Sequence, residues 1–578
     1  MAQTLIARRD MDFLLHEWLR VGELDRGTVD AFIDLSEKLA IDHFLNHYKG
    51  SDIEEPVLAS GGVRIYPAIG EALTQYAKLG LFAASFSEDL GGLGIPHLVC
   101  AASFAYFAAA NIATAAYPML TVANARLIST FGTPAQIEQF ARPQIEGRWF
   151  GTMCLSEPQA GSSLADIRTR ATLQGSDRWG QRFRLHGNKM WISGGDQDVS
   201  ENIVHLVLAK IPDEAGAMRD GTAGLSLFIV PKYLPDGTRN DVIVAGLNHK
   251  LGYRGTANCL LNFGEGEGAV GWIIGKQGQG LRQMFRMMNE ARIAVGLGAA
   301  ALGYRAYRLS AEYARERLQG RSFGQRSGPL VAIIEHPDVK RMLLAQKAYA
   351  EGALALCLYC ANLMDQRTET AESLLGLLTP VAKTWASEYG LAANDIAIQV
   401  HGGYGYTREF AVEQLWRDNR LNPIHEGTTG IQAIDLVGRK IVRDGRALSA
   451  LDEVILKTAR RAASVESLAD FSAALQRGWE KIDSAIQTLR QVDERHVLDN
   501  ATPFLWAFGH LVVAWLWLDQ ALAAGDLEAS RDSEGAFALG KLRTCRYFYE
   551  CELPRVGPWL ALVASTSDIA ANAPTEMF

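Results

Sequence analysis

The 578-residue sequence is poor in cysteine: it has seven, an odd number, scattered from Cys100 to Cys551. This count and spacing argue against a disulfide framework. Cys357 and Cys360 form a C-x-x-C pair, but they lie in the apolar run ALALCLYCANL, with no second pair and no nearby His. We interpret them as packed core, and we expect no metal site.

The N-terminus lacks the apolar segment of a signal peptide, because charged residues follow Arg8 and Arg9 directly. Two uncharged runs, residues 98–120 and 504–518, are candidates for membrane spans. The first contains Asn111 and Pro118, and the second is shorter than the roughly 20 residues that a span needs. We expect both to be buried helices without a membrane span, in a protein of the cytoplasm or an organelle matrix.

An excess of positive charge is also missing, since the formal net charge is −8. This balance argues against a general nucleic-acid surface, while a local basic pocket for an anionic ligand stays compatible with it. No G-x-G-x-x-G follows a predicted strand and opens a helix, because the glycines of residues 264–268 and 275–280 have the wrong spacing. A Rossmann site is therefore unsupported, and any dinucleotide must be held in another way.

The length predicts about three or four domains, and the residue pattern changes along the chain. Residues 1–150 carry apolar residues at helical spacing, and residues 151–276 read as short strands separated by Gly, Asp and Asn. Residues 277–445 return to long helices, and residues 446–578 add further helices. We predict an α+β protein, mainly α, with a compact, barrel-like antiparallel β domain between helical domains.

Residues 399–440 carry the most chemical information. Their Gly-rich turn, with Gly402 and Gly403, is followed by an amphipathic run and then by Glu426 in the small-residue loop HEGTTG, before another helix. A carboxylate at such a junction can project into a pocket, and apolar surroundings would raise its pKa, as a base for a weak carbon acid needs. The alternative is a solvated Glu before a helix that is capped by Thr428 or Thr429.

This segment resembles the C-terminal signature of the acyl-CoA dehydrogenase family, G-G-x-G-[FY] followed by I-[YH]-E-G-T-x-x-I-Q. Residues 153–163 (MCLSEPQAGSS) and 187–195 (GNKMWISGG) resemble two further motifs of the family, in family order. The resemblance covers most of residues 1–445. It implies an N-terminal helical domain, a central antiparallel β domain and a C-terminal four-helix bundle, and the helices beyond them resemble the extra bundle of a long subgroup that includes 3-methylmercaptopropionyl-CoA dehydrogenases.

The resemblance also implies FAD as the cofactor. Ser156 and Ser193 would hydrogen-bond its ring, each in the place of a family Thr, and Trp191 would cover one ring face. Ser163 stands in the place of a family Asp, and Ser87 in the place of a family Pro. The cofactor-binding residues implied are Met153, Leu155, Ser156, Gly161, Ser162, Trp191, Ile192, Ser193, Arg321, Phe323, Gln399, Gly402, Gly403, Thr428 and Gly430.

Arg317 and Arg321 are alternatives for the contact with the FAD pyrophosphate across a dimer interface, because this chain carries a short insertion there. We favour Arg321, since Phe323 and Gly324 follow it closely, as they do in the family motif. A guanidinium suits the task because it stays charged and binds phosphate with two parallel hydrogen bonds. The substrate-binding residues implied are Ser162, Asn289, Arg292 and Gly427.

The chemistry implied is α,β-dehydrogenation of an acyl-CoA: Glu426 removes the α-proton and the β-hydrogen passes as hydride to flavin N5. His425, where many members carry Tyr, would retune the base. An electron-transfer flavoprotein as acceptor and a homodimer are implied as well. The alternatives are an acyl-CoA oxidase using O₂, a flavin monooxygenase or nitroalkane-oxidase-like relative, and a non-catalytic scaffold; the intact Glu426 speaks against the last two.

Overall fold

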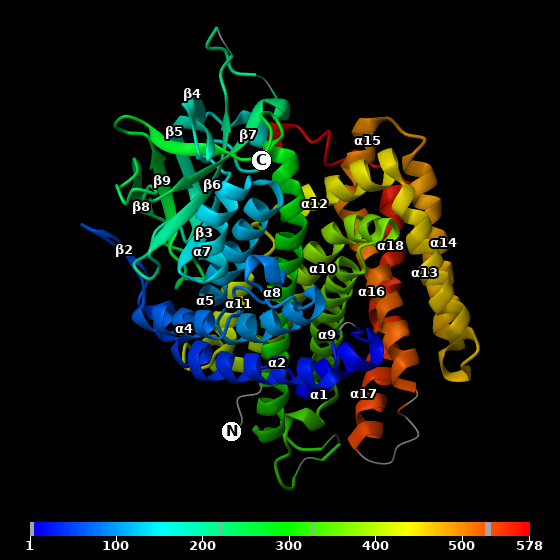
Figure 1. The fold of residues 1–578 in the computed structure, drawn as a ribbon. Coiled ribbons are helices and arrows are strands. Elements are labelled where there is room, and N and C mark those ends of the chain that lie inside the picture. The colour runs from blue at the N-terminus through cyan, green and yellow to red at the C-terminus, as the bar shows by residue number, and fades with distance from the viewer. Residues whose placement is uncertain are drawn as a thin grey trace. The chain divides into compact units, whose positions relative to one another are not determined.

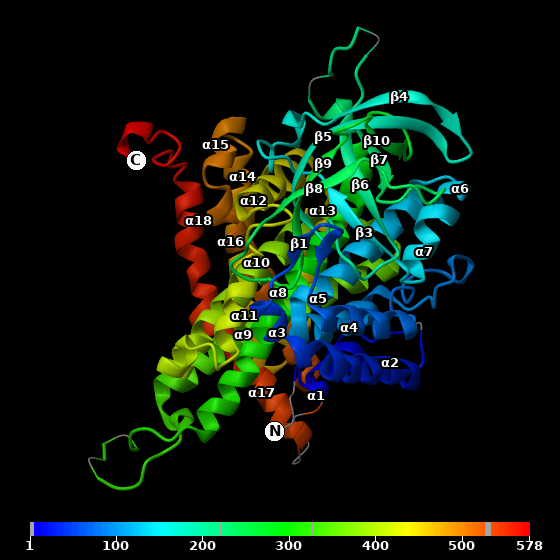
Figure 2. The same ribbon diagram turned by 90° about the vertical axis from the view of Figure 1, so that its left-hand side faces the viewer.

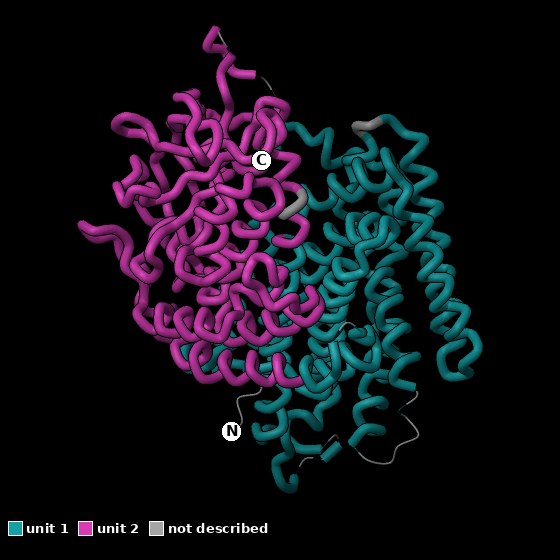
Figure 3. Tube along the Cα trace, viewed as in Figure 1, with its two compact units in different colours: residues 1–29, 292–578 teal, residues 30–291 magenta. Residues whose placement is uncertain are grey.

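The computed structural model describes residues 5–22, 24–213, 215–219, 221–322, 324–325, 327–525, 527 and 533–578 (Figures 1 and 2). The chain forms two compact units, coloured separately in Figure 3. Unit 1 contains Met1–Val29 and Arg292–Phe578, and unit 2 contains Asp30–Ala291. The first residues of the chain thus belong to the same unit as its C-terminal half.

Unit 2 begins with helices, as the sequence predicts for residues up to 150. A small hairpin of β1 (Val57–Ala59) and β2 (Gly62–Arg64) interrupts them, which the helical spacing did not indicate. Thr133 caps α6 with a capping box to Gln136, and Pro134 occupies the first turn. The helices are α2 (Arg26–Leu39), which starts in unit 1, α3 (Gly50–Ile53), α4 (Pro67–Lys78), α5 (His97–Phe131), α6 (Pro134–Gln136) and α7 (Arg142–Ile145).

The rest of unit 2 is one sheet, which can be followed in Figure 2. Its order is β10-β7-β6-β4-β5-β9-β8, and β10 also pairs with β5, so the order returns on itself as in a barrel. The strands are β3 (Trp149–Cys154), β4 (Arg170–Asp177), β5 (Gly180–Ser193), β6 (Asn202–Lys210), β7 (Leu225–Pro231), β8 (Val242–Leu247), β9 (Asn258–Phe263) and β10 (Ala269–Ile273).

The predicted antiparallel β domain is confirmed for most pairs, with one difference in detail. Strand β3 pairs with β6 in parallel, and β4 touches β6 in parallel through the single pair of Arg170 and Lys210. Strand β3 enters the sheet directly from the N-terminal helices, so no hairpin fixes its direction. Its position beside β6, which is buried along its whole length, explains why neither strand alternates in burial.

Unit 1 contains long helices, which confirms the helical character predicted for residues 277–578. The core helices are α1 (Arg8–Asp12), α8 (Gly280–Glu316), which begins in unit 2, α9 (Pro337–Gln366), α10 (Glu369–His401), α11 (Val412–Asn419) and α12 (Thr429–Ile434). A π-helical segment, Asp435–Asp444, continues α12. Cys357 and Cys360 are fully buried inside α9, which confirms that they are packed core.

The extra C-terminal helices are α13 (Arg446–Ala463), α14 (Ala469–Leu489), α15 (Glu494–Asp499), α16 (Ala501–Gly525), α17 (Ser533–Tyr547) and α18 (Val556–Ala564). An apolar stripe at helical spacing lies on α14, where Leu475, Ile482 and Ile486 are buried. Helix α16 lies at the centre of this extension and contacts α13, α14, α17 and α18 (Figure 1).

Two helices are long and apolar enough to span a membrane by length and composition, α5 and α16. In each, 83% of the most apolar window is buried inside the protein. The prediction that both uncharged runs form buried helices is therefore confirmed.

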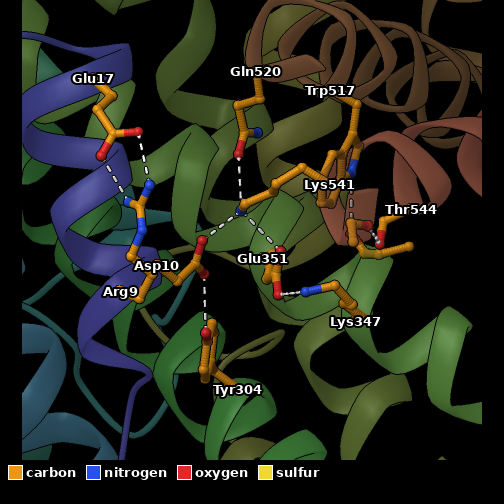
Figure 4. Close-up of polar contacts among 12 residues, drawn as sticks. Arg9, Asp10, Glu17, Tyr304, Lys347, Glu351, Trp517, Gln520, Lys541 and Thr544 are labelled. Carbon is orange, nitrogen blue, oxygen red and sulfur yellow. Dashed lines mark hydrogen bonds and ion pairs between the residues drawn. The ribbon is translucent and has the colours of Figure 1, made fainter. Parts of the chain in front are cut away.

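A cluster of buried charges joins the N-terminal helix to the C-terminal half of unit 1 (Figure 4). Lys541 of α17 lies 2.5 Å from Asp10 of α1 and 2.9 Å from Glu351 of α9. Tyr304 of α8 donates to the second oxygen of Asp10 at 2.9 Å, and Lys347 pairs with Glu351. Because two lysines face two carboxylates, the charges balance, and each buried ion has partners.

We expect Lys541→Met to lower the free energy of unfolding by about 3–5 kcal/mol, because it leaves two buried carboxylates facing one lysine. Urea unfolding measures this change. The matched control is Arg546→Ala on the same helix, whose ion pair with Glu550 is exposed; it should cost no more than about 0.5 kcal/mol. Equal effects of the two substitutions would contradict the importance of the cluster.

Candidate active site

Glu426 lies in a loop between α11 and α12, half-buried. Its backbone has φ +53°, in the left-handed region that non-glycine residues rarely adopt. Gly427 follows with φ +96°, and a Cβ there would lie 2.5 Å from Nε2 of Gln432. The same Nε2 donates to the Glu426 carbonyl at 3.1 Å, so Gln432 fixes the strained turn and only glycine fits beside it.

A chain of amide side chains anchors this loop to the helices behind it. Asn394 of α10 and Asn419 of α11 each donate to a backbone carbonyl of α8 at 3.1 Å. Asn419 also donates to Asn394 at 2.6 Å, Asn422 donates to Asn419 at 2.8 Å, and His425 Nε2 lies 3.0 Å from Asn422 Oδ1. The residue beside Glu426 is thereby tied to the core of unit 1.

Two cations act on the Glu426 carboxyl. Its pKa is raised because it is surrounded by protein, although Arg292 and Lys383 partly offset this effect by favouring the charged form. Arg292 is held in place by Asp435, with Nη1 3.0 Å from Oδ2, and both side chains are buried. The proton affinity of Glu426 is therefore increased, and two fixed positive charges influence its ionisation.

Lys383 of α10 is the residue of this site that the sequence analysis missed. It is fully buried, and among the described residues no group hydrogen-bonds its Nζ. Burial lowers its pKa to about 7, against the attraction of Glu426 and Glu388. Its one sequence signal is a lysine inside the apolar run LLTPVAKTWAS.

His425 does not carry a charge beside Glu426 at neutral pH. Burial, with Lys383 as a second cause, lowers the pKa of this imidazole to about 3. Any influence of His425 on Glu426 therefore acts through hydrogen bonding and position.

The strands that carry the other two motifs are joined by a buried ion pair in unit 2. Lys189 Nζ lies 3.0 Å from Glu157 Oε1 and donates to the Leu155 carbonyl at 2.9 Å. The backbone N–H of Met190 donates to the Ser156 carbonyl at 3.0 Å. Burial disfavours the charge on Glu157, but Lys189 and donors from Thr169 and Arg168 outweigh it and lower its pKa to about 2.

Trp191 lies at a β-bulge, because the pairing of β5 with β9 shifts between Lys189 and Ile192. Its φ is +66° and 56% of its side chain is exposed, while Ile192 beside it is buried. The bulge thus turns a large, rigid aromatic plane outward beside Ser193, whose Oγ accepts from Asn258 at 3.3 Å. An exposed indole on a strained strand is a surface suited to a flat ligand.

The remaining predicted residues differ in their surroundings. In unit 2, Met153 is buried, Gly161 and Ser162 are exposed, and Asn289 is half-buried. In unit 1, Thr428 is the N-cap of α12, one of the two alternatives, accepting from Ile431 N at 3.4 Å. Gln399 and Gly430 are exposed, and Phe323 lies outside the described residues.

A pocket of about 460 Å³ in unit 1 contains both glycines of the Gly-rich turn, Gly402 and Gly403. Arg317 lines it and lies over the Tyr404 ring, with 5.9 Å from its guanidinium carbon to the centroid. Arg321, which we favoured, donates its Nε to the Gly328 carbonyl at 2.9 Å instead, and is not among the described residues that line this pocket. Of the two alternatives, Arg317 is the one that the structure brings to the Gly-rich turn.

Comparison with known families gives matches along almost the whole chain. Residues 64–148, 152–265 and 278–441 match the N-terminal, middle and C-terminal domains of acyl-CoA dehydrogenase. Residues 451–574 match a fourth model, "Acetyl-CoA dehydrogenase C-terminal like", which covers the extra helices.

Characterised relatives cover the same length. The chain is 35% identical to 3-methylmercaptopropionyl-CoA dehydrogenase of Ruegeria pomeroyi, with 90% of each chain covered. It is 34% identical to a broad-specificity linear acyl-CoA dehydrogenase of Mycobacterium tuberculosis, with 94% of this chain and 95% of the relative covered.

Solved structures have the same fold. One from Caenorhabditis elegans, in complex with C11-CoA, superposes with a TM-score of 0.78 at 20% identity, covering 98% of this chain and 94% of the other. An acyl-CoA dehydrogenase complexed with FAD from Bacillus anthracis gives 0.75 at 20% identity, covering 98% and 93%. This chain belongs to the acyl-CoA dehydrogenase family, the FAD-dependent oxidoreductases that act on the CH–CH bond of acyl-CoA thioesters.

Proposed function

We propose that Glu426 is the base that removes the α-proton of the acyl-CoA substrate. The observation that carries this proposal is its environment: a carboxyl with a raised pKa, in a strained and anchored loop, with two buried cations behind it. The α-hydrogen of a thioester is a very weak acid, so a base of increased proton affinity transfers the proton with a smaller energetic mismatch. Arg292 and Lys383 limit this increase, because both favour the ionised form of the carboxyl.

FAD fits the residues of unit 2 that the family motifs select. The exposed indole of Trp191 and the hydroxyl of Ser193 lie at the end of β5, and Ser156 follows the end of β3. Lys189 and Glu157 hold these two segments together. When bound, FAD supplies the redox chemistry by accepting the β-hydrogen as hydride. In this proposal Trp191 covers one face of the flavin, and the serines hydrogen-bond its edge.

The pocket around Gly402 and Gly403 supports a role for this turn in binding the adenosine diphosphate part of FAD. The exposed glycines let a ligand approach the backbone closely, and Arg317 supplies a permanent positive charge beside them. We propose Arg317 for the pyrophosphate contact, and Arg321 stays the alternative.

The substrate-side residues follow from the same motifs. We propose that Ser162, Asn289, Arg292 and Gly427 contact the acyl-CoA, with the backbone N–H of the base loop as a donor to the thioester oxygen. We propose in addition that an electron-transfer flavoprotein accepts the electrons, that the protein is a homodimer and that it lies in the cytoplasm. We also propose domain boundaries at residues 150, 276 and 445.

The function is tested by mixing the purified protein anaerobically with saturated acyl-CoAs and recording the visible spectrum. The panel includes the 3-methylmercaptopropionyl, butyryl and longer linear thioesters, because the relatives act on such substrates. Bleaching of the flavin band is the expected result. A flavoprotein that no member of the panel bleaches would contradict the proposed activity, and rapid O₂ uptake during turnover would identify an oxidase instead.

We expect Glu426→Gln to retain bound FAD and to lower the rate of flavin reduction by at least about 10³-fold, because the general base is lost. Stopped-flow bleaching measures the rate, and the flavin-to-protein absorbance ratio reports FAD content. Glu453→Gln, on α13, is the matched control. Substantial bleaching by the Glu426 variant would remove this residue from the role of base.

We expect Lys383→Met to shift the pH dependence of flavin reduction. Reduction needs ionised Glu426, so its rate rises as the pH passes through the raised pKa of this carboxyl. Removing a cation raises that pKa further, and the rising limb should move to higher pH. Lys457→Met, at an exposed lysine of α13, should leave the profile in place; a shift to lower pH in the Lys383 variant would refute the assignment.

We expect Lys189→Met to lower the free energy of unfolding by about 3–5 kcal/mol, because Glu157 is left buried and unpaired. The two segments that carry Ser156 and Trp191 then lose the ion pair between them, so FAD should be lost during gel filtration. Glu267→Gln is the control, since Glu267 is 88% exposed in its ion pair with Arg184 of the same strand β5. Full FAD retention in the Lys189 variant would argue against a role of the pair in holding the flavin strands.

A further inference from the structure

The C-terminal extension reaches the loop of the proposed base through one carboxylate. Glu388 of α10 accepts from Thr429 Oγ1 at 2.8 Å with one oxygen and from Trp506 Nε1 at 2.7 Å with the other. Thr429 is the first residue of α12, three positions after Glu426, and Trp506 belongs to α16 of the extension. Glu388 therefore bridges the extension and the helix that begins at the base loop.

This bridge has little freedom to rearrange. Helix α16 contacts both α10 and α12. The Trp506 ring also lies 5.9 Å from that of Trp559 in α18, which restricts its rotamer. Burial raises the pKa of Glu388, and the donors Thr429 and Trp506, followed by the charge of Lys383, work against this rise. The two hydrogen bonds thus support the ionised form of a carboxylate that solvent reaches poorly.

The base loop needs such support from outside. It contains a non-glycine residue with positive φ, Glu426, and such a conformation persists only where the surrounding structure holds it. The chain of asparagines holds the loop on the side of His425, before Glu426. On the side after Glu426, the side-chain anchors are Gln432, within α12 itself, and Glu388, from another helix.

We propose that Glu388 and Trp506 are positioning residues, through which the C-terminal extension sets the place of Glu426 in the active site. The proposal rests on the proposed function of Glu426 as the base. It assigns the extension, in which the described residues show no catalytic cluster of their own, a part in the reaction. A displacement of the base by about 1 Å can lower a rate by as much as 100-fold, so a small shift of α12 is enough.

The test is Trp506→Phe in the full-length holoenzyme, a change that removes the N–H and keeps most of the aromatic ring. We expect the maximal rate of flavin reduction by acyl-CoA to fall about 10-fold, while the half-saturating substrate concentration and the FAD content stay within about 2-fold. Thr429→Val should have the same effect, and Thr429→Ser, which keeps the hydroxyl, should restore the rate. The double variant should lose much less than the product of the single losses, because both changes break the same bridge.

Trp515→Phe is the matched control. Trp515 lies on the same helix, is more deeply buried, and donates its Nε1 to Thr458 at 3.0 Å, away from the base loop. It should lower the thermal stability at least as much as Trp506→Phe and leave the rate of flavin reduction unchanged. Equal loss of rate in the two tryptophan variants would overturn the proposal, because the extension would then act only through general stability.

Failure of this inference differs from failure of the proposed function. If Trp506→Phe and Thr429→Val reduce flavin at the wild-type rate while Glu426→Gln does not, the bridge has no positioning role and the base assignment stands. If Glu426→Gln itself reduces flavin at the wild-type rate, the base assignment fails, and the inference that rests on it fails as well.

Discussion

The close approach of helices α8 and α10 is the constraint on which the surroundings of Glu426 in unit 1 depend. A Cβ at Gly296 would lie 2.5 Å from the Ala382 carbonyl, and one at Gly390 would lie 2.5 Å from the Ala299 carbonyl. The two backbones are thus nearly in contact, and side chains project only to the sides of the seam. Lys383 follows Ala382 directly, so this packing buries an amine in a place that water reaches poorly.

The same contact between α8 and α10 supplies the anchors of the loop that carries Glu426. Asn419 donates to the carbonyl of Ala299, the residue that Gly390 approaches so closely, and the remaining amides extend from there to His425. A substitution that separated the two helices would therefore move the anchors of Glu426 and change the burial of Lys383 at once. The position and the proton affinity of Glu426 are coupled through one helix contact.

Buried charges in this protein have two different roles. Glu157 with Lys189, and Asp10 with Lys541, are matched pairs whose members satisfy one another, and their function is to hold segments of the chain together. Lys383 lacks such a partner among the described residues, and it acts on Glu426 together with Arg292, which Asp435 holds in place. Buried charges that only satisfy one another serve structure, whereas a cation near a carboxyl can also tune its proton affinity.

Much of this protein could be predicted from its sequence because local patterns determined it. The strands at residues 182–193 and 202–211 and the stripe on α14 follow from residue spacing, and the motif around Glu426 identified the family. The Glu388 bridge could not be predicted, since its partners are 41 and 118 residues away and each looks like an ordinary helix residue. The parallel pairing of β3 with β6 and the pairing of Asp10 with Lys541 could not be predicted either, because only the folded topology brings these segments together.

The bulge at Trp191 has a consequence for how the length of this strand can vary. Along β5, Phe183, Leu185 and Lys189 point inward at odd positions, whereas after the bulge the buried residue is Ile192, at an even one. The extra residue thus changes the parity of the strand. Deleting or inserting a single residue between Lys189 and Ile192 would turn the inward-facing side chains of the rest of the strand outward, and the outward-facing ones inward. The number of residues in this part of the motif is therefore fixed by the strand geometry as well as by the chemistry of its side chains.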